Sequence, residues 1–359
     1  GIVMTIDVEK PALNVKEKLK EVDKPSGVAG EALLRADTTQ QQQELLGIGR
    51  RNIVMNGGFD IWQRGNSLTD PSNSYNNFTA DRWSAYFAGT YTQQQTTLPN
   101  GDYVNYFRGV LGTTNSNRIN INHFIENGNS IMSGKYVTVS FWLACDRPGS
   151  EVNVKLQSTS GTSFTSYTQL ANKYIKTEQD WKKYEITFHC YNDMANNSAR
   201  PHGLLEFDGS DAQWPNGSTF EIAQVQIEIG RVATPFEHRS YGEELALCRR
   251  YYWCIDGAEG GNGNVYHGNL AMYRVNQWFW GVQHPTRMRV EASHTIVGNN
   301  NLSLIEGGGT SRTKAISGNS SHKGPDNHMF FISDSGPSNH DVAEVLIPSA
   351  MKIEFDAEL

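Results

Sequence analysis

The stretch Ile222–Cys254, IAQVQIEIGRVATPFEHRSYGEELALCRRYYWC, separates two β-rich parts of the chain. Its first part is rich in β-branched residues, which predicts a buried strand that the following glycine ends. Pro235 restricts the residue before it to extended backbone, so the TPFE segment predicts a turn. Ser240 and Glu243 have the spacing of a capping box, which predicts a helix over 241–252. The stretch therefore closes one β-domain, turns a corner and starts a helix that leads into another.

Residues 51–239 have the pattern of an all-β domain. Short apolar runs are separated by turns rich in Asn, Gly, Ser and Pro, and in Tyr136–Ala144 alternate residues are apolar. With the strand Ile222–Ile229 there are about eight to ten such runs, which favours a two-sheet sandwich of jelly-roll type. The other clear strands are predicted at Tyr103–Val110, Arg118–Ile125, Glu151–Gln157, Trp181–Cys190 and Gly203–Phe207.

Residues 240–359 predict the linker helix followed by a small C-terminal antiparallel β-domain. The fold class expected for the whole chain is therefore mainly β, with a short helical arm at the N-terminus. The strands of the C-terminal domain are predicted at 265–275, 279–282, 289–297, 315–316, 328–333, 342–347 and 351–355.

Residues 1–50 differ from the rest because they contain no aromatic residue and carry several helix signals. Helices this short are marginal alone in water, so their leucines need a surface to cover. We expect an arm for attachment or oligomerisation, with a flexible leader as the alternative. The helix over 241–252 predicts an interchain seam, because three of its residues share one stripe. The interface residues expected from both segments are Leu33, Leu45, Leu46, Leu245, Cys248 and Tyr252.

Composition excludes several classes of function. The net charge of −7 argues against nucleic acid as the main partner. The sequence contains no run of 18 apolar residues, so we expect no membrane insertion. The four cysteines lack CxxC spacing and predict buried free thiols. Metalloprotease, nucleophile-elbow and EF-hand patterns are absent, and the ten histidines are dispersed. We expect no cofactor, no metal and no enzymatic activity, although carboxylates for a glycosidase pair are available at Asp60, Asp81, Asp146, Glu206 and Asp208.

The aromatic share of 11% is somewhat high, and in a β-protein it fits either large aromatic pairs in the core or exposed rings that bind sugars. A sugar site needs an aromatic ring against the sugar and polar side chains around its hydroxyls. Core packing is the commoner role of any single aromatic and remains the alternative. The candidate glycan contacts are Tyr75, Asn77, Tyr167 and Trp214 in the first β-domain, and Tyr266, Tyr273, Trp278 and Trp280 in the second.

Three motifs carry a resemblance to a known family: NIVMNGGFDIWQRG at 52–65, ADRW at 80–83, and QIEIGRVATPFEHRSYGEELALCRRYY at 226–252. They resemble bacteriophage tail fibre and related virion appendage proteins, and the β-domain between them is similar to jelly-roll carbohydrate-binding modules. The closing FDAEL at 355–359 resembles the small β-domain that ends such chains.

The resemblance implies a homotrimer at the periphery of a virion, on the tail or the capsid. Residues 1–50 would contact other virion proteins, and the β-domains would bind host cell-surface polysaccharide during adsorption. It carries over no catalytic residue. A capsid decoration or tail joint protein with a purely structural role is the alternative.

Overall fold

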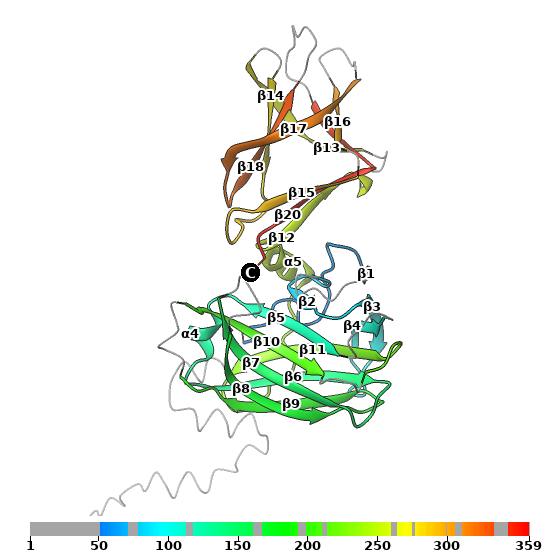
Figure 1. Ribbon diagram of the computed structural model, residues 1–359, viewed down its shortest axis with the longest axis vertical. Helices are drawn as coiled ribbons and strands as arrows, with labels where there is room; N and C mark the ends of the chain where they lie inside the picture. Colours follow the sequence, from blue (N-terminus) through cyan, green and yellow to red (C-terminus); the bar gives the residue numbers. More distant parts are fainter. Residues whose placement is uncertain are drawn as a thin grey trace, which may run out of the picture. The chain divides into compact units, whose positions relative to one another are not determined.

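The computed structural model describes residues 51–70, 78–112, 118–160, 167–192, 199–209, 214–259, 264–274, 277–298, 300–305, 311–333 and 344–358 (Figure 1). The chain divides into two compact units, Gly1–Arg51 and Asn52–Leu359. The predicted arm, with Leu33, Leu45 and Leu46, lies outside the described residues. The second unit holds both of the predicted β-domains.

The first part of this unit is a sandwich of two antiparallel sheets, as the strand pattern predicts. The six-stranded sheet has the order β1 (Ser67–Asp70), β3 (Gly89–Thr97), β4 (Tyr103–Leu111), β11 (Thr219–Ile229), β6 (Tyr136–Cys145) and β9 (Lys182–His189). The five-stranded sheet has the order β2 (Trp83–Ala85), β5 (Ile119–Ile125), β10 (His202–Gly209), β7 (Glu151–Thr159) and β8 (Tyr167–Lys176). Non-consecutive strands are neighbours in both sheets, which confirms the jelly-roll expectation. A short helix, α4 (Gly128–Met132), joins β5 to β6.

Side-chain alternation builds the core between the two sheets. In β6, Val137, Val139, Phe141 and Leu143 are fully buried in the sandwich core. Their neighbours Thr138, Ser140 and Trp142 therefore point to the outer face of the six-stranded sheet, because successive strand residues face opposite sides. The same rule gives the five-stranded sheet an outer face of its own.

A β-bulge interrupts strand β11 between Ala223 and Gln226, where the register to β6 shifts. Gln224 has a left-handed φ of 47° there. The Val225 amide freed by the bulge donates to the Gly57 carbonyl at 2.9 Å. A Cβ at Gly57 would lie 2.1 Å from the Val225 oxygen, so only glycine allows this approach. The NGG motif is therefore a backbone requirement of the bulge.

The helix α5 (Tyr241–Arg249) begins with the predicted capping box. The Glu243 amide donates to the Ser240 hydroxyl at 3.4 Å, and the Ser240 amide donates to the Glu243 carboxylate at 3.0 Å. The helix ends at Arg249 rather than at 252, because Tyr252 already belongs to strand β12.

The C-terminal region combines a small sheet and a closed barrel, both antiparallel. The three-stranded sheet has the order β12 (Tyr252–Asp256), β20 (Met351–Asp356) and β15 (Ser293–Gly298), and a 3₁₀ turn, η2 (Gly257–Glu259), follows β12. The barrel has the order β13 (Asn264–Arg274), β14 (Gln277–Gln283), β18 (Asn327–Ser333), β17 (Ser311–Lys323), β16 (Asn301–Ile305) and β19 (Glu344–Pro348). This region was expected to be a small antiparallel domain, and closure of the barrel removes the edges that a short open sheet would expose.

The fully buried guanidinium of Arg82 joins the sandwich to the last residues of the chain. It forms an ion pair with Glu358 and donates to the Phe124 carbonyl at 2.9 Å. The Tyr251 ring lies 3.6 Å from its central carbon. Burial lowers the pKa of Arg82 to about 10, so the side chain stays charged at neutral pH.

The neighbouring Arg64 makes a second set of contacts to the same region. Its guanidinium pairs with Asp356 at 3.1 Å and lies 3.6 Å from the centre of the Tyr252 ring. The side-chain amide of the preceding residue, Gln63, donates to the Tyr252 carbonyl at 2.8 Å. The motifs at 52–65, 80–83 and 226–252 and the residues 355–358 thus meet at one junction.

The predicted interchain seam on α5 is wrong for two of its three residues. Cys248 has an exposed fraction of 0% and Tyr252 of 1%, because both lie inside this junction. Leu245 is half-buried. Cys145, Cys190 and Cys248 are buried free thiols, as expected, and Cys254 is partly exposed. Among the described residues, no helix has the length and apolar character needed to span a membrane.

Replacing Arg82 with alanine is expected to lower the free energy of unfolding by about 3–5 kcal/mol, because it breaks a buried ion pair and leaves Glu358 with Arg64 alone, 3.6 Å away. Urea unfolding measures the change. Arg147→Ala is the matched control, since the Arg147 side chain is 45% exposed and its pair with Asp146 is 4.0 Å long. It should change stability by less than about 0.5 kcal/mol. Equal effects of the two substitutions would contradict the role of Arg82.

We expect His328 to make the stability of the fold depend on pH. Its side chain is 1% exposed, and neither ring nitrogen has a hydrogen-bond partner among the described residues. Burial, with help from His294, His284 and Lys323, lowers the pKa of His328 to about 4, while Glu291 opposes the shift. The neutral form is thus favoured in the folded chain, and stability falls as pH drops below the unfolded value of about 6.5.

As the pH falls from 7 to 5, His328 should lower the free energy of unfolding by about 2 kcal/mol. In His328→Phe the loss should be smaller by that amount, as measured by urea unfolding at both pH values. The exposed His189, replaced by glutamine, should keep the wild-type loss. An unchanged loss in His328→Phe would show that this histidine is not the group responsible.

Candidate functional site

The outer face of the five-stranded sheet carries polar side chains where its inner face carries apolar ones. In β5, Ile119, Ile121 and Ile125 enter the core, and Asn120 and Asn122 point outward. Asparagine is depleted in strands, so its repetition here needs a reason other than strand propensity. We call this surface the polar face, and its members are Asn120, Asn122, Asn153, Lys155, Asn172, Glu206, Asp208 and Arg118.

Two carboxylates and two cations form the centre of the polar face. Lys155 lies 2.5 Å from Asp208 and 3.5 Å from Glu206. Arg118 lies 2.9 Å from Asp208 and 3.9 Å from Glu206. These groups come from β7, β10 and the residue preceding β5, so pairing of distant strands brings them together.

Glu206 is the most buried charged group of this cluster, with an exposed fraction of 8%. Burial raises the pKa of its carboxyl, Asp208 adds to the rise, and Lys155, Asn120 and Arg118 oppose it. The Asn120 amide donates to Glu206. Lys155 is held in its charged form, because its two carboxylate partners outweigh burial and raise its pKa.

Some polar atoms of this face have no partner among the described residues. Asn122 Oδ1 and Gln157 Oε1 are buried and accept no hydrogen bond there, and the Ser84 hydroxyl beside them is also unpaired. Each such group costs about 1–3 kcal/mol when it stays unpaired. These three residues are almost fully buried, so the groups that a ligand can reach on this face are the more exposed ones.

Two exposed tyrosines stand on the edge strand β8, on the same side as the polar residues. Tyr174 is opposite Asn153 in the register and Tyr167 is opposite Thr159, and the two rings are 57% and 53% exposed. Asn172, between them, donates to Asn153 at 3.1 Å. Their register partners Asn153 and Thr159 are six residues apart, so at about 3.3 Å per residue the two tyrosines stand roughly 20 Å apart along the strand, a span suited to an extended ligand.

The structure separates the candidate glycan contacts into three groups. Tyr167 lies on the polar face. Trp214 and Trp280 are wrong as contacts, because both are fully buried: Trp214 packs edge-on against Phe220 in the sandwich, and Trp280 stacks on Phe330 in the barrel. The remaining candidates lie outside the described residues or have side chains outside them: Tyr75, Asn77, Tyr266, Tyr273 and Trp278.

Sequence reasoning missed Tyr174, Lys155 and Arg118, and named Glu206 and Asp208 only as available carboxylates. The signal that could have found the face is the Ile–Asn alternation of residues 119–122, which predicts a strand with a polar outer side. The described residues contain no group of three or more side chains suited to hold a metal ion.

Comparison of the fold with solved structures finds carbohydrate-binding modules with jelly-roll folds. A putative sugar binding protein from Bacteroides thetaiotaomicron is 15% identical, with a TM-score of 0.33 over 50% of this chain and 100% of that chain. The CBM22-2 xylan-binding domain of Paenibacillus barcinonensis Xyn10C is 16% identical, with a TM-score of 0.28 over 46% and 98%.

The enzymatically active domain of bacteriophage CBA120 tailspike protein 4 is 14% identical, with a TM-score of 0.31 over 50% of this chain and 21% of that chain. These likenesses concern the fold alone, and the ligands and activities named belong to those proteins. No protein-family model matches the sequence, and a search of curated proteins finds no match either.

Proposed function

We propose that the polar face binds a polysaccharide. The observation that carries this proposal is the combination of two exposed rings with a charged and amide-rich surface beside them on one sheet face. Tyr167 and Tyr174 would stack on the apolar faces of sugar rings. Arg118 and Asn172, both partly open to solvent, would hydrogen-bond sugar hydroxyls between the rings.

The face is proposed to bind without cleaving. Glu206 and Asp208 are the carboxylates available there, and both lie within 4 Å of Lys155 and Arg118. A general acid needs a free path to the glycosidic oxygen, but Glu206 is only 8% exposed and Asp208 is paired with both Arg118 and Lys155. Incubation with a bound polysaccharide should therefore release no reducing ends.

We further propose that the chain is a virion appendage of a bacteriophage, a tail fibre or a similar structure, which binds host surface glycans during adsorption. The support is the resemblance of the motifs at 52–65, 80–83 and 226–252. In this proposal three chains assemble, residues 1–50 attach them to the particle, and weak binding at each site is strengthened by multivalency. A glycan array and a competition assay with host cells test it. No binding in either would favour a purely structural joint or decoration protein.

Removing Tyr174 is expected to weaken polysaccharide binding. Loss of one stacked ring should cost about 1–2 kcal/mol, or roughly a 5- to 30-fold lower affinity for Tyr174→Ala. Isothermal titration with the polysaccharide found on the array measures it. Tyr241→Ala is the control, because Tyr241 is 63% exposed but lies on α5, away from the sheet face. A similar loss in both variants, or in neither, would contradict the assignment.

Deleting residues 1–50 is expected to abolish incorporation into particles. The remaining chain should stay folded, because residues 52–359 form a compact unit of their own. Particle incorporation is measured by immunoblot of purified virions, and folding by circular dichroism. Normal incorporation of the shortened chain would sink the attachment role of this segment.

A further inference from the structure

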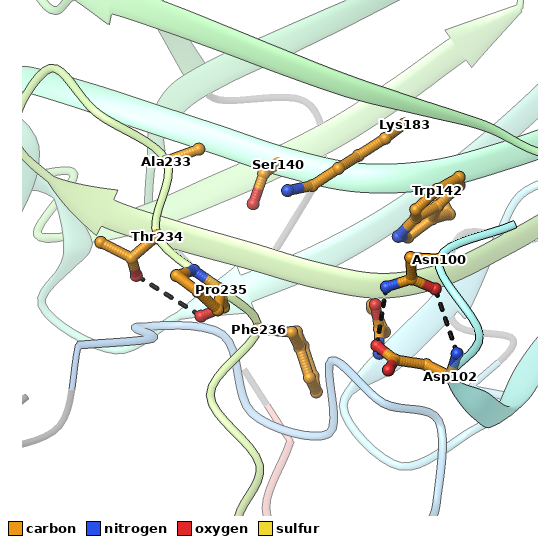
Figure 2. Close-up of a pocket in the computed structure, with 10 residues that line it drawn as sticks. Asn100, Asp102, Ser140, Trp142, Lys183, Ala233, Thr234, Pro235 and Phe236 are labelled. Atoms are coloured by element: carbon orange, nitrogen blue, oxygen red, sulfur yellow. Dashed lines mark hydrogen bonds between the residues drawn. The ribbon is translucent and has the colours of Figure 1, made fainter. Parts of the chain in front are cut away.

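A hollow of about 340 Å³ lies on the outer face of the other, six-stranded sheet. Its floor is formed by Ser140 and Trp142 of β6, with Lys183 of β9 beside them. The turn that carries Asn100 and Asp102 lies on one side, as Figure 2 shows. The loop 233–236 lies on the other. With Gln224 of β11, the hollow is built from five segments of the sandwich.

The loop that forms one wall is fixed to the sheet. The Glu228 carboxylate accepts from the Thr234 amide at 3.0 Å and from its hydroxyl at 2.5 Å. Gln226 accepts from the Glu237 amide at 2.8 Å. Both anchoring residues point outward from β11, so the wall keeps its place without a ligand.

Gln224 reaches the hollow because of the β-bulge. Its left-handed backbone directs the side chain over the sheet, where its amide nitrogen donates to Asp102 Oδ2 at 3.1 Å. For any residue other than glycine, this left-handed backbone conformation costs about 1–2 kcal/mol. Bulges that re-aim a side chain are frequent next to binding sites.

Several polar atoms lie around the hollow. Asp102 Oδ2 accepts from Asn100 at 2.8 Å and from Gln224, but Oδ1 takes part in neither bond. The Ser140 hydroxyl, Trp142 Nε1 and Gln224 Oε1 belong to other side chains that line the hollow. Ser140 and Gln224 are largely buried, with exposed fractions of 4% and 5%. These are two acceptors, one donor and one hydroxyl that can act as either.

The charge of the hollow is balanced. Hydrogen bonds from Gln224 and Asn100 lower the pKa of Asp102, so its carboxylate is ionised at neutral pH. Lys183 supplies a positive charge across from it and is itself paired with Glu185 at 2.7 Å. A ligand with a net charge of either sign would meet one attracting and one repelling group, so the hollow favours neither sign. Donors and acceptors around a balanced hollow suit a neutral molecule with several hydroxyls.

We propose that this hollow is a second ligand site that takes one neutral sugar unit. Its volume lies at the lower end of the range for small-molecule pockets, about 300–1,000 Å³, which fits one or two sugar rings. Trp142 and Phe236 supply apolar surface, and Asp102, Gln224 and Ser140 supply acceptors for hydroxyls. The site goes beyond the polar face, lies on the opposite sheet and does not depend on binding there.

The test follows the indole resonance of Trp142 by two-dimensional nitrogen–proton NMR, with Trp142→Phe to assign it. The probes are methyl α-glucoside, methyl α-galactoside, methyl α-mannoside and methyl glucuronide. A saturable shift is expected with at least one neutral glycoside. Absence of a shift with all three neutral glycosides, or a shift with the glucuronide alone, would overturn the proposal.

Variants separate the two sites. Asp102→Ala should weaken the interaction at Trp142 at least about tenfold, the loss expected when a charged hydrogen-bond acceptor is removed. Gln224→Gly removes the side chain and relieves its backbone, so binding should fall while the unfolding temperature does not. Tyr174→Ala, on the polar face, should leave the Trp142 titration unchanged. If binding survives Asp102→Ala and is lost in Tyr174→Ala, the hollow is not the site.

Discussion

The buried guanidinium of Arg82 is the interaction on which the arrangement of the second unit depends. A charge with no exposure is costly unless its hydrogen-bonding capacity is used. Here a carbonyl from β5 and the carboxylate of Glu358 accept from its two terminal nitrogens, and the Tyr251 ring lies against it, while Nε has no partner among the described residues. Because these partners come from the sandwich, the segment after α5 and the end of the chain, the cation holds three distant segments in one place.

This junction gives the conspicuous motifs a structural meaning. Asn56, in the NGG motif, bonds to Ile61, to Asp81 and to Glu244. Gln226 and Glu228 hold the turn after β11, and the capping box starts α5. The motifs therefore fix how strands and helix connect, whereas the two outer sheet faces carry the groups suited to ligands. Recognition is assigned to the faces and not to the motifs.

Local patterns predicted the parts of the fold that local physics decides. The apolar alternation of β6 and the Ser240–Glu243 cap both depend on residues close in sequence, and both were found. Strand β8 was missed, because a bulge near Leu170 breaks its alternation and its outer side is polar. Trp214 was expected to be a glycan contact, but contacts with distant residues bury it. Likewise the polar face exists only once β5, β7 and β10 pair, so no single segment predicts it.

The central claim is that the polar face binds a polysaccharide. The most direct measurement is a map of backbone amide shifts in the full chain as oligosaccharides from the host surface are added. The account predicts the largest shifts on β7, β8 and β10, around Lys155, Tyr174 and Glu206. Saturable binding that leaves these three strands unchanged would contradict it.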